Sequence, residues 1–172
     1  MLRQMTEEDQ IRAVHHKYEI PEDTVKTLLK EGIRYLDIDK AALIACLSGK
    51  SIQEILARRK EQPWGKILKN LGLTGETYEE KYNVHRARRL HRFYGVEEKR
   101  AKKALEEGYP NHWIRMAYLL ETKTGKPMEE ILAIKTKSTK WKPWAEEHLG
   151  VAPEDLAKWI LETRNPSLKP KA

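Results

Sequence analysis

The sequence predicts an all-α protein made of two tandem copies of a four- to five-helix unit. The main observation is an internal repeat, since a shift of 76 residues brings identical residues into register, among them Arg12 with Arg88, His15 with His91, and Glu54–Ala57 with Glu130–Ala133. About a third of positions 11–62 are identical at this shift, whereas unrelated helical sequences would share roughly a tenth. Prolines and glycines also fall where helices start and stop, and no segment has the pattern of a strand.

Each copy opens with a long helix, expected over residues 6–18 and 76–93. A second helix follows Pro21 and its acidic neighbours, whose charges suit the positive end of a helix dipole. This helix closes at Gly32, which Gly108 matches in copy two.

The third helix of copy one ends at Gly49, and Ser51 then starts a fourth helix with apolar residues at helical spacing. Gly125 and Pro127 occupy the matching places in copy two. Later helices are expected after Pro63, Pro143 and Pro153.

Copy two contains an insertion over residues 139–142 that copy one lacks. From these elements we expect a first helical repeat over 1–75, a second repeat over 76–164 and a flexible tail over 165–172.

A single cysteine excludes an internal disulfide. Cys46 lies in the apolar run Ala41–Leu47, so we expect a buried and unreactive thiol. The polar N-terminus does not resemble a signal peptide, and no apolar stretch approaches the ~18 residues of a membrane-spanning helix. We therefore expect a cytoplasmic protein.

Motifs that suggest chemistry have simpler structural explanations. Ser48–Ser51 contains the Gly-Lys-Ser of a phosphate-binding loop, but Ile44 stands where that loop needs a glycine. The histidines lack metal-ligand spacing, and the recurrence of His15 as His91 indicates a packing or capping role. No nucleophile stands beside a base at a recognisable spacing, so we expect no enzymatic activity, no cofactor and no metal.

One segment is similar to the first helix and turn of a helix-turn-helix motif. In Trp64–Leu73, Gly72 would lie at the turn, and a long basic helix would follow from Thr77. Leu68, however, occupies a place that usually holds a small residue. An ordinary helix–glycine–helix corner is the alternative interpretation.

The net charge of +7 belongs entirely to the second half, because residues 1–85 contain as many acidic as basic residues. The excess forms two clusters, within 86–103 and 135–142, which would attract polyanions. Copy one has no lysine or arginine at the places matching the main cations of the first cluster, so the fold does not require them. A solvated helix face is the alternative interpretation. The residues expected to bind nucleic acid are Arg86, Arg89, Arg92, Lys99, Arg100, Lys103, Lys140, Trp141 and Lys142.

Three tryptophans carry separate expectations. Trp64 and Trp144 are repeat counterparts, so we expect both to be buried. Trp141 lies in the insertion between Lys140 and Lys142, so we expect an exposed side chain that anchors a partner.

Short motifs recur in both copies. Copy one contains Gly49-Lys50-Ser51, Glu54-Ile55-Leu56-Ala57, and Trp64-Gly65-Lys66-Ile67 with Leu71-Gly72. Copy two repeats them as Gly125-Lys126-Pro127 and Glu130-Ile131-Leu132-Ala133, then departs at Trp144-Ala145. This pattern resembles a tandem helical repeat of uncharacterised bacterial proteins. The resemblance implies the helical fold and implies no particular activity.

Two functions are compatible with these features. The first is non-catalytic nucleic-acid binding through a basic surface on copy two. The second is a helical scaffold or adaptor for a protein partner, including a second copy of the chain as a homodimer. Phosphate-driven binding weakens steeply with salt, whereas a largely apolar interface responds little, so a salt series separates them.

Overall fold

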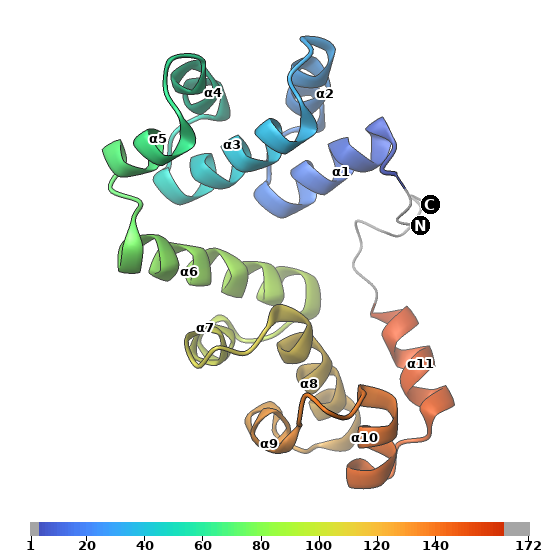
Figure 1. The fold of residues 1–172 in the computed structure, drawn as a ribbon. Coiled ribbons are helices and arrows are strands. Elements are labelled where there is room, and N and C mark those ends of the chain that lie inside the picture. Colours follow the sequence, from blue (N-terminus) through green and yellow to red (C-terminus); the bar gives the residue numbers. More distant parts are fainter. Residues whose placement is uncertain (1–3, 164–172) are drawn as a thin grey trace. The chain divides into compact units, whose positions relative to one another are not determined.

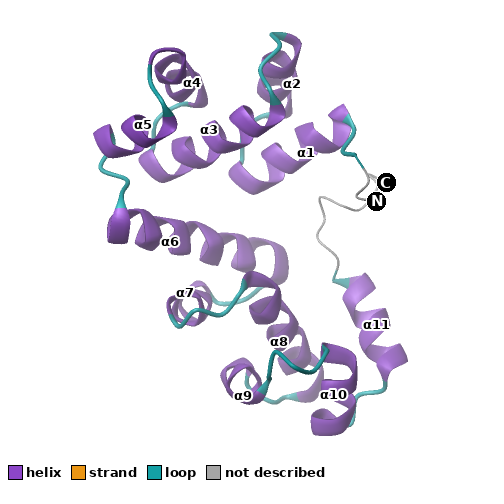
Figure 2. Ribbon diagram, in the orientation of Figure 1, coloured by secondary structure: helices purple, strands orange, loops and turns teal. Residues whose placement is uncertain are grey.

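The computed structural model describes residues 4–163, and within them it contains eleven α-helices and no strand (Figures 1 and 2). The predicted all-α class is therefore confirmed. The chain divides into two compact units, residues 1–85 and 86–172, whereas the sequence placed the boundary after residue 75. The tail predicted over 165–172 lies outside the described residues.

The first unit is built around one central helix. Its helices are α1 (Glu7–Tyr18), α2 (Glu22–Lys30), α3 (Tyr35–Ser48), α4 (Ile52–Glu61) and α5 (Trp64–Asn70), followed by the first part of α6 (Gly75–Tyr94). Helix α3 packs against α1, α2 and α4, as Figure 1 shows. The core of this unit includes Val14, Ile38, Ile44, Ile55 and Ile67, which are fully buried.

Local capping explains where these helices begin and end. Helix α1 starts with a capping box, in which Thr6 and Asp9 each accept the other's backbone N–H. Helix α3 ends at Gly49 in the left-handed conformation, and the Ser51 side chain then accepts the backbone N–H of Glu54. The Gly-Lys-Ser sequence thus joins one helix end to the next helix start.

The second unit repeats this helix order. It contains the end of α6, then α7 (Glu98–Glu106), α8 (Asn111–Thr124), α9 (Met128–Ile134), α10 (Trp141–Leu149) and α11 (Pro153–Glu162). Helix α8 packs against α7 and α9, and α10 packs against α11. Trp144 is 1 % exposed and lies in the core with Ile114, Leu120, Ile131 and Leu156, which confirms its predicted burial.

Helix α10 begins two residues earlier than the sequence suggested. The helix starts at Trp141, with Lys140 in the extended conformation before it, and not at Pro143. A proline is tolerated there because the N–H groups of a first helical turn have no intrahelical acceptor. Residues 141–142 of the insertion therefore extend a helix, while residues 139–140 lie in the connection before it.

Corresponding helices of the two units begin 76 residues apart. Helices α2, α3 and α4 start at Glu22, Tyr35 and Ile52, and α7, α8 and α9 start at Glu98, Asn111 and Met128. The recurring histidines also make the same bond, because Nδ1 of His15 contacts the Ile20 carbonyl at 2.7 Å and Nδ1 of His91 contacts the Val96 carbonyl at 3.0 Å. Both histidines thus tie the end of a long helix to the segment that follows, which is a structural role of the kind expected from their recurrence.

Two burial predictions in the first unit are wrong. Cys46 is exposed, because successive residues of a helix point about 100° apart and its neighbours Ala45 and Leu47 take the inward directions. Trp64 is only half-buried, since its ring lies at the surface beneath the cations of Lys40 and Arg59. An apolar run in a sequence does not imply that every residue in it faces the core.

No helix in the described part of the chain is long and apolar enough to cross a membrane.

Candidate nucleic-acid interface

The first predicted basic cluster lies on α6 and α7. Arg86 and Arg89 are partly buried on the last turns of α6, and Arg92 is exposed nearer its end. Lys99 and Lys103 are exposed on α7. These five residues stay candidates for binding, but they do not share one environment.

Arg100 is paired within the second unit and only partly exposed, and its assignment as a binding residue stays a prediction. Its guanidinium contacts Glu121 at 2.5 Å and Glu129 at 2.6 Å, so two carboxylates offset one cation. These hydrogen bonds raise the pKa of Arg100 and hold the pKa of both carboxyls below the ordinary value of 4.5. The nearby charge of Lys103 lowers the pKa of Glu129 further.

The second basic cluster is also smaller than the sequence suggested. Lys140 and Lys142 are exposed. Lys135 is only 7 % exposed, and its Nζ lies 4.7 Å from the ring centre of Trp113 and 4.9 Å from that of Trp141. The same Nζ donates to the carbonyl oxygens of Thr136 and Thr139, and burial lowers its pKa. Lys135 therefore holds the α9–α10 connection together and is not a surface cation.

Trp141 is not the exposed anchor that the sequence predicted. It packs against the core of the second unit, with its ring edge-on to Trp113 at 5.6 Å and to Trp144 at 5.8 Å. Its Nε1 atom is buried. The reason is the early start of α10, which turns Trp141 inward at the first helical position.

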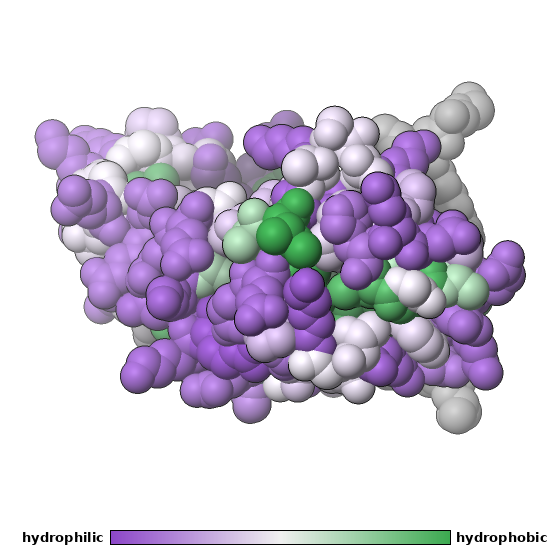
Figure 3. Space-filling model, turned by 90° about the horizontal axis from the view of Figure 1, so that it is seen from below, coloured by the Kyte–Doolittle hydropathy of each residue, from purple (hydrophilic) through white to green (hydrophobic). Residues whose placement is uncertain are grey.

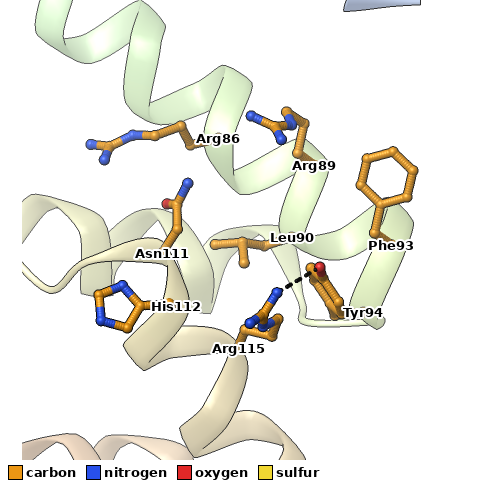
Figure 4. Close-up of a pocket in the computed structure, with 8 residues that line it drawn as sticks. All are labelled: Arg86, Arg89, Leu90, Phe93, Tyr94, Asn111, His112 and Arg115. Carbon is orange, nitrogen blue, oxygen red and sulfur yellow. Dashed lines mark hydrogen bonds between the residues drawn. The ribbon is translucent and has the colours of Figure 1, made fainter. Parts of the chain in front are cut away.

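The structure brings two of the predicted arginines together with residues that the sequence did not single out. Arg86 and Arg89 on α6 line a recess of about 190 Å³, and Figure 4 shows Asn111, His112 and Arg115 of α8 lining it as well. Leu90, Phe93 and Tyr94 complete the lining. None of the eight lining residues is acidic.

Arg115 is held in a fixed orientation within this recess. Its Nη1 donates a hydrogen bond to the Tyr94 hydroxyl at 3.0 Å, drawn as a dashed line in Figure 4, and its guanidinium lies 5.2 Å from the centre of the Tyr94 ring. A neutral phenol leaves the positive charge of the arginine uncompensated. Such a guanidinium is pre-organised to receive an anion, because little side-chain freedom remains to be lost on binding.

Two buried polar atoms at the recess lack hydrogen-bond partners within the described residues. They are Nε of Arg89, which is a donor, and Oδ1 of Asn111, which is an acceptor. The start of α8 lies beside them, and no side chain caps that end. Its first backbone N–H groups and the positive end of its dipole add to the field of the arginines.

The first unit has the opposite charge at the matching place. The residue 76 positions before Arg115 is Asp39, whose carboxylate pairs with Lys17 at 2.5 Å and accepts the Tyr18 hydroxyl at 3.4 Å. Each unit thus has a tyrosine here, Tyr18 in the first and Tyr94 in the second. The hydrogen-bond partner of this tyrosine changes from an acid, Asp39, to a base, Arg115. This reversal is the signal that could have identified Arg115 from the sequence.

The helix that follows the α5–α6 corner begins with acidic residues, which would repel the phosphates of a nucleic acid. A recognition helix contacts bases through its N-terminal residues, but the first turns of α6 carry Glu76, Glu79 and Glu80. The basic residues begin only at Arg86, several turns later. The helix-turn-helix interpretation therefore stays an untested prediction with an electrostatic argument against it.

A comparison with protein-family models, with curated proteins and with solved structures finds no match. The resemblance to a bacterial helical repeat therefore stays a prediction, and the site has to be interpreted from its own geometry.

Proposed function

We propose that the protein is a non-catalytic nucleic-acid-binding protein of the cytoplasm, and that its second unit makes the contact. The single observation that carries this proposal is the recess between α6 and α8, which three arginines line and no acidic residue does. Guanidinium groups match phosphate oxygens in geometry as well as charge, and phosphate contacts dominate nucleic-acid affinity.

Exposed cations elsewhere in the second unit support this proposal. They are Arg92, Lys99, Lys103, Lys140 and Lys142. They would add sequence-independent attraction to phosphates, because each ion pair with a phosphate releases counterions from the nucleic acid. Arg100 and Trp141, which face other parts of the protein, are not included.

We also infer that the two units arose by duplication. The matching starts of three successive helices and the shared histidine contacts support this inference. Under this hypothesis the first unit keeps the fold with a paired Asp39, while the second unit acquired arginines at the same surface. The charge difference between the units is then functional, since the fold itself tolerates either sign.

The proposal is tested by electrophoretic mobility shift with mixed DNA and RNA from about 50 to 200 mM salt. We expect binding at low salt, and loss of binding in the double variant Arg89→Glu/Arg115→Glu. Lys26→Glu is the control, because it also replaces a positive charge with a negative one, but on the exposed surface of α2 in the first unit. This variant should bind nucleic acid nearly as well as the parent protein. Absence of binding by the parent protein at 50 mM salt would refute the proposal.

A protein scaffold remains the alternative function. Leu36 and Leu161 are large apolar residues that are 74 % and 63 % exposed. They lie on helices of different units, and single exposed leucines are ordinary on protein surfaces. On the face drawn in Figure 3, hydrophobic residues form small separate patches among hydrophilic ones. These observations favour the scaffold less than the arginine recess favours a polyanion.

A further inference from the structure

We infer that the recess of the second unit receives the terminal phosphomonoester of a nucleic-acid strand. This inference rests on the proposed function and adds to it the part of the nucleic acid that is recognised. The argument has three steps, which concern the shape of the site, its charge and its unsatisfied polar atoms.

The shape of the site favours a strand end. A phosphate within a strand carries a sugar on each side, so it fits a groove that is open at both ends, which the strand can enter and leave. Arg89 and Arg115 instead line a recess of about 190 Å³ together with Leu90, Phe93 and Tyr94. A terminal phosphate has a substituent on one side only and can enter such a recess.

The charge of the site favours the same group. A phosphomonoester carries about −1.5 to −2 charges at pH 7, whereas a diester within the strand carries one. Two well-placed guanidinium groups suit the larger charge, since each can donate two parallel hydrogen bonds to phosphate oxygens. Arg115 is already oriented by its bond to Tyr94, and Arg89 has a buried Nε with no protein acceptor.

The unsatisfied atoms call for a ligand that both accepts and donates hydrogen bonds. Nε of Arg89 needs an acceptor, which a phosphate oxygen supplies, and Oδ1 of Asn111 needs a donor. A hydroxyl of the terminal sugar is such a donor. A terminal nucleotide therefore satisfies both atoms at once, while a buried polar atom left unpaired is unfavourable.

The experiment measures fluorescence anisotropy with a single-stranded oligonucleotide in four forms: with a 5′-phosphate, with a 3′-phosphate, with hydroxyl ends, and as a closed circle of the same sequence. We expect one phosphorylated form to bind about tenfold more tightly than the hydroxyl and circular forms, which is the effect of roughly one additional charge-assisted hydrogen bond. A nucleoside monophosphate should compete for this preference.

Variants locate the preference. Arg89→Ala and Arg115→Ala should each abolish the advantage of the phosphorylated end. Arg88→Ala is the matched control, because Arg88 is the adjacent, exposed arginine of α6 and does not line the recess. It should weaken all four forms equally or not at all. Circular dichroism confirms that each variant keeps its helices.

Each outcome separates this inference from the proposed function. Equal affinity for all four forms would overturn end recognition while leaving nucleic-acid binding intact. A preference that survives in Arg89→Ala and Arg115→Ala would overturn the assignment to this recess. Tight binding of nucleoside monophosphate or inorganic phosphate without any oligonucleotide binding would overturn both proposals and indicate a small phosphate ligand.

Discussion

The cluster of Arg100, Glu121 and Glu129 yields the most quantitative prediction, because replacing Arg100 leaves two facing carboxylates without their cation. Arg100→Met keeps the aliphatic stem and removes only the charge and the donors. The side chains of Arg100 and Glu121 are 29 % and 21 % exposed, so the cluster is intermediate between a surface pair and a buried pair. Surface pairs contribute about 0.2–1 kcal/mol, and removing one partner of a buried pair costs about 3–5 kcal/mol.

We therefore expect Arg100→Met to lower the free energy of unfolding by about 2 kcal/mol. For a chain of 172 residues that unfolds cooperatively, this corresponds to a fall in melting temperature of about 4–8 °C. Arg58→Met is the matched control, since Arg58 pairs with Glu54 at 3.0 Å within one helix at the surface. Its loss should cost about 0.3–0.5 kcal/mol. Urea unfolding followed by circular dichroism measures both.

Neutralising the whole cluster tests the physical reason. In Arg100→Met/Glu121→Gln/Glu129→Gln no carboxylate remains uncompensated, and the Gln side chain at 121 can still accept the backbone N–H of Met128, which Glu121 accepts at 2.9 Å. This triple variant should be more stable than Arg100→Met and within about 1 kcal/mol of the parent. The reasoning is refuted if Arg100→Met costs less than about 0.5 kcal/mol or if the triple variant is the less stable one.

The same cluster predicts a pH dependence. The pKa of Glu121 and of Glu129 is lower in the folded protein than the ordinary value of 4.5, so their stabilising contribution is complete above that value. The contribution is lost as the pH falls through the folded pKa values, where both carboxyls become protonated. The stability difference between the parent and Arg100→Met should therefore shrink between pH 7 and pH 3.

Three further predictions concern single positions. Cys46 is exposed, with its Sγ 3.7 Å from the Tyr18 carbonyl oxygen, and it should react with a disulfide reagent such as DTNB in the native protein, so that a reaction that requires denaturant would contradict the structure. Ser51→Ala should lower the free energy of unfolding by about 1 kcal/mol through loss of a helix cap, and no change in urea unfolding would contradict this. Lys135→Met should lower the free energy of unfolding by about 2 kcal/mol and shift the tryptophan emission. The reason is that Nζ of Lys135 lies against the rings of Trp113 and Trp141 and donates to two carbonyl oxygens. Unchanged emission would contradict this placement of Lys135.

The helix starts and ends could be predicted from the sequence because their causes are local. The cap at Ser51 and the left-handed Gly49 depend on residues within one or two turns. The start of α10 was missed because a proline is tolerated at any position of the first helical turn, so Pro143 alone does not fix the boundary.

The candidate site could be predicted only in part, because its decisive contacts join distant segments. Spacing on a helix correctly placed Arg86 and Arg89 near each other. It gave no information on Arg100, whose acidic partners lie 21 and 29 residues further along the chain. The change from Asp39 to Arg115 between the copies was a signal in the sequence, but only the packing of α8 beside the end of α6 shows that Arg115 lines the recess.

Helix α6 has a consequence for how the protein unfolds. Its 20 residues run without interruption from Gly75 to Tyr94, while the division between the units falls within it, after His85. The two portions, 75–85 and 86–94, are each shorter than the ~12–15 residues that an isolated helix needs in water. Each portion is therefore held by packing, Tyr78 against the first core and Leu90 in the second, and melting of one unit shortens the helix that the other retains. Nearest-neighbour coupling of this kind makes denaturation of a repeat protein cooperative across its units, as in a short one-dimensional array.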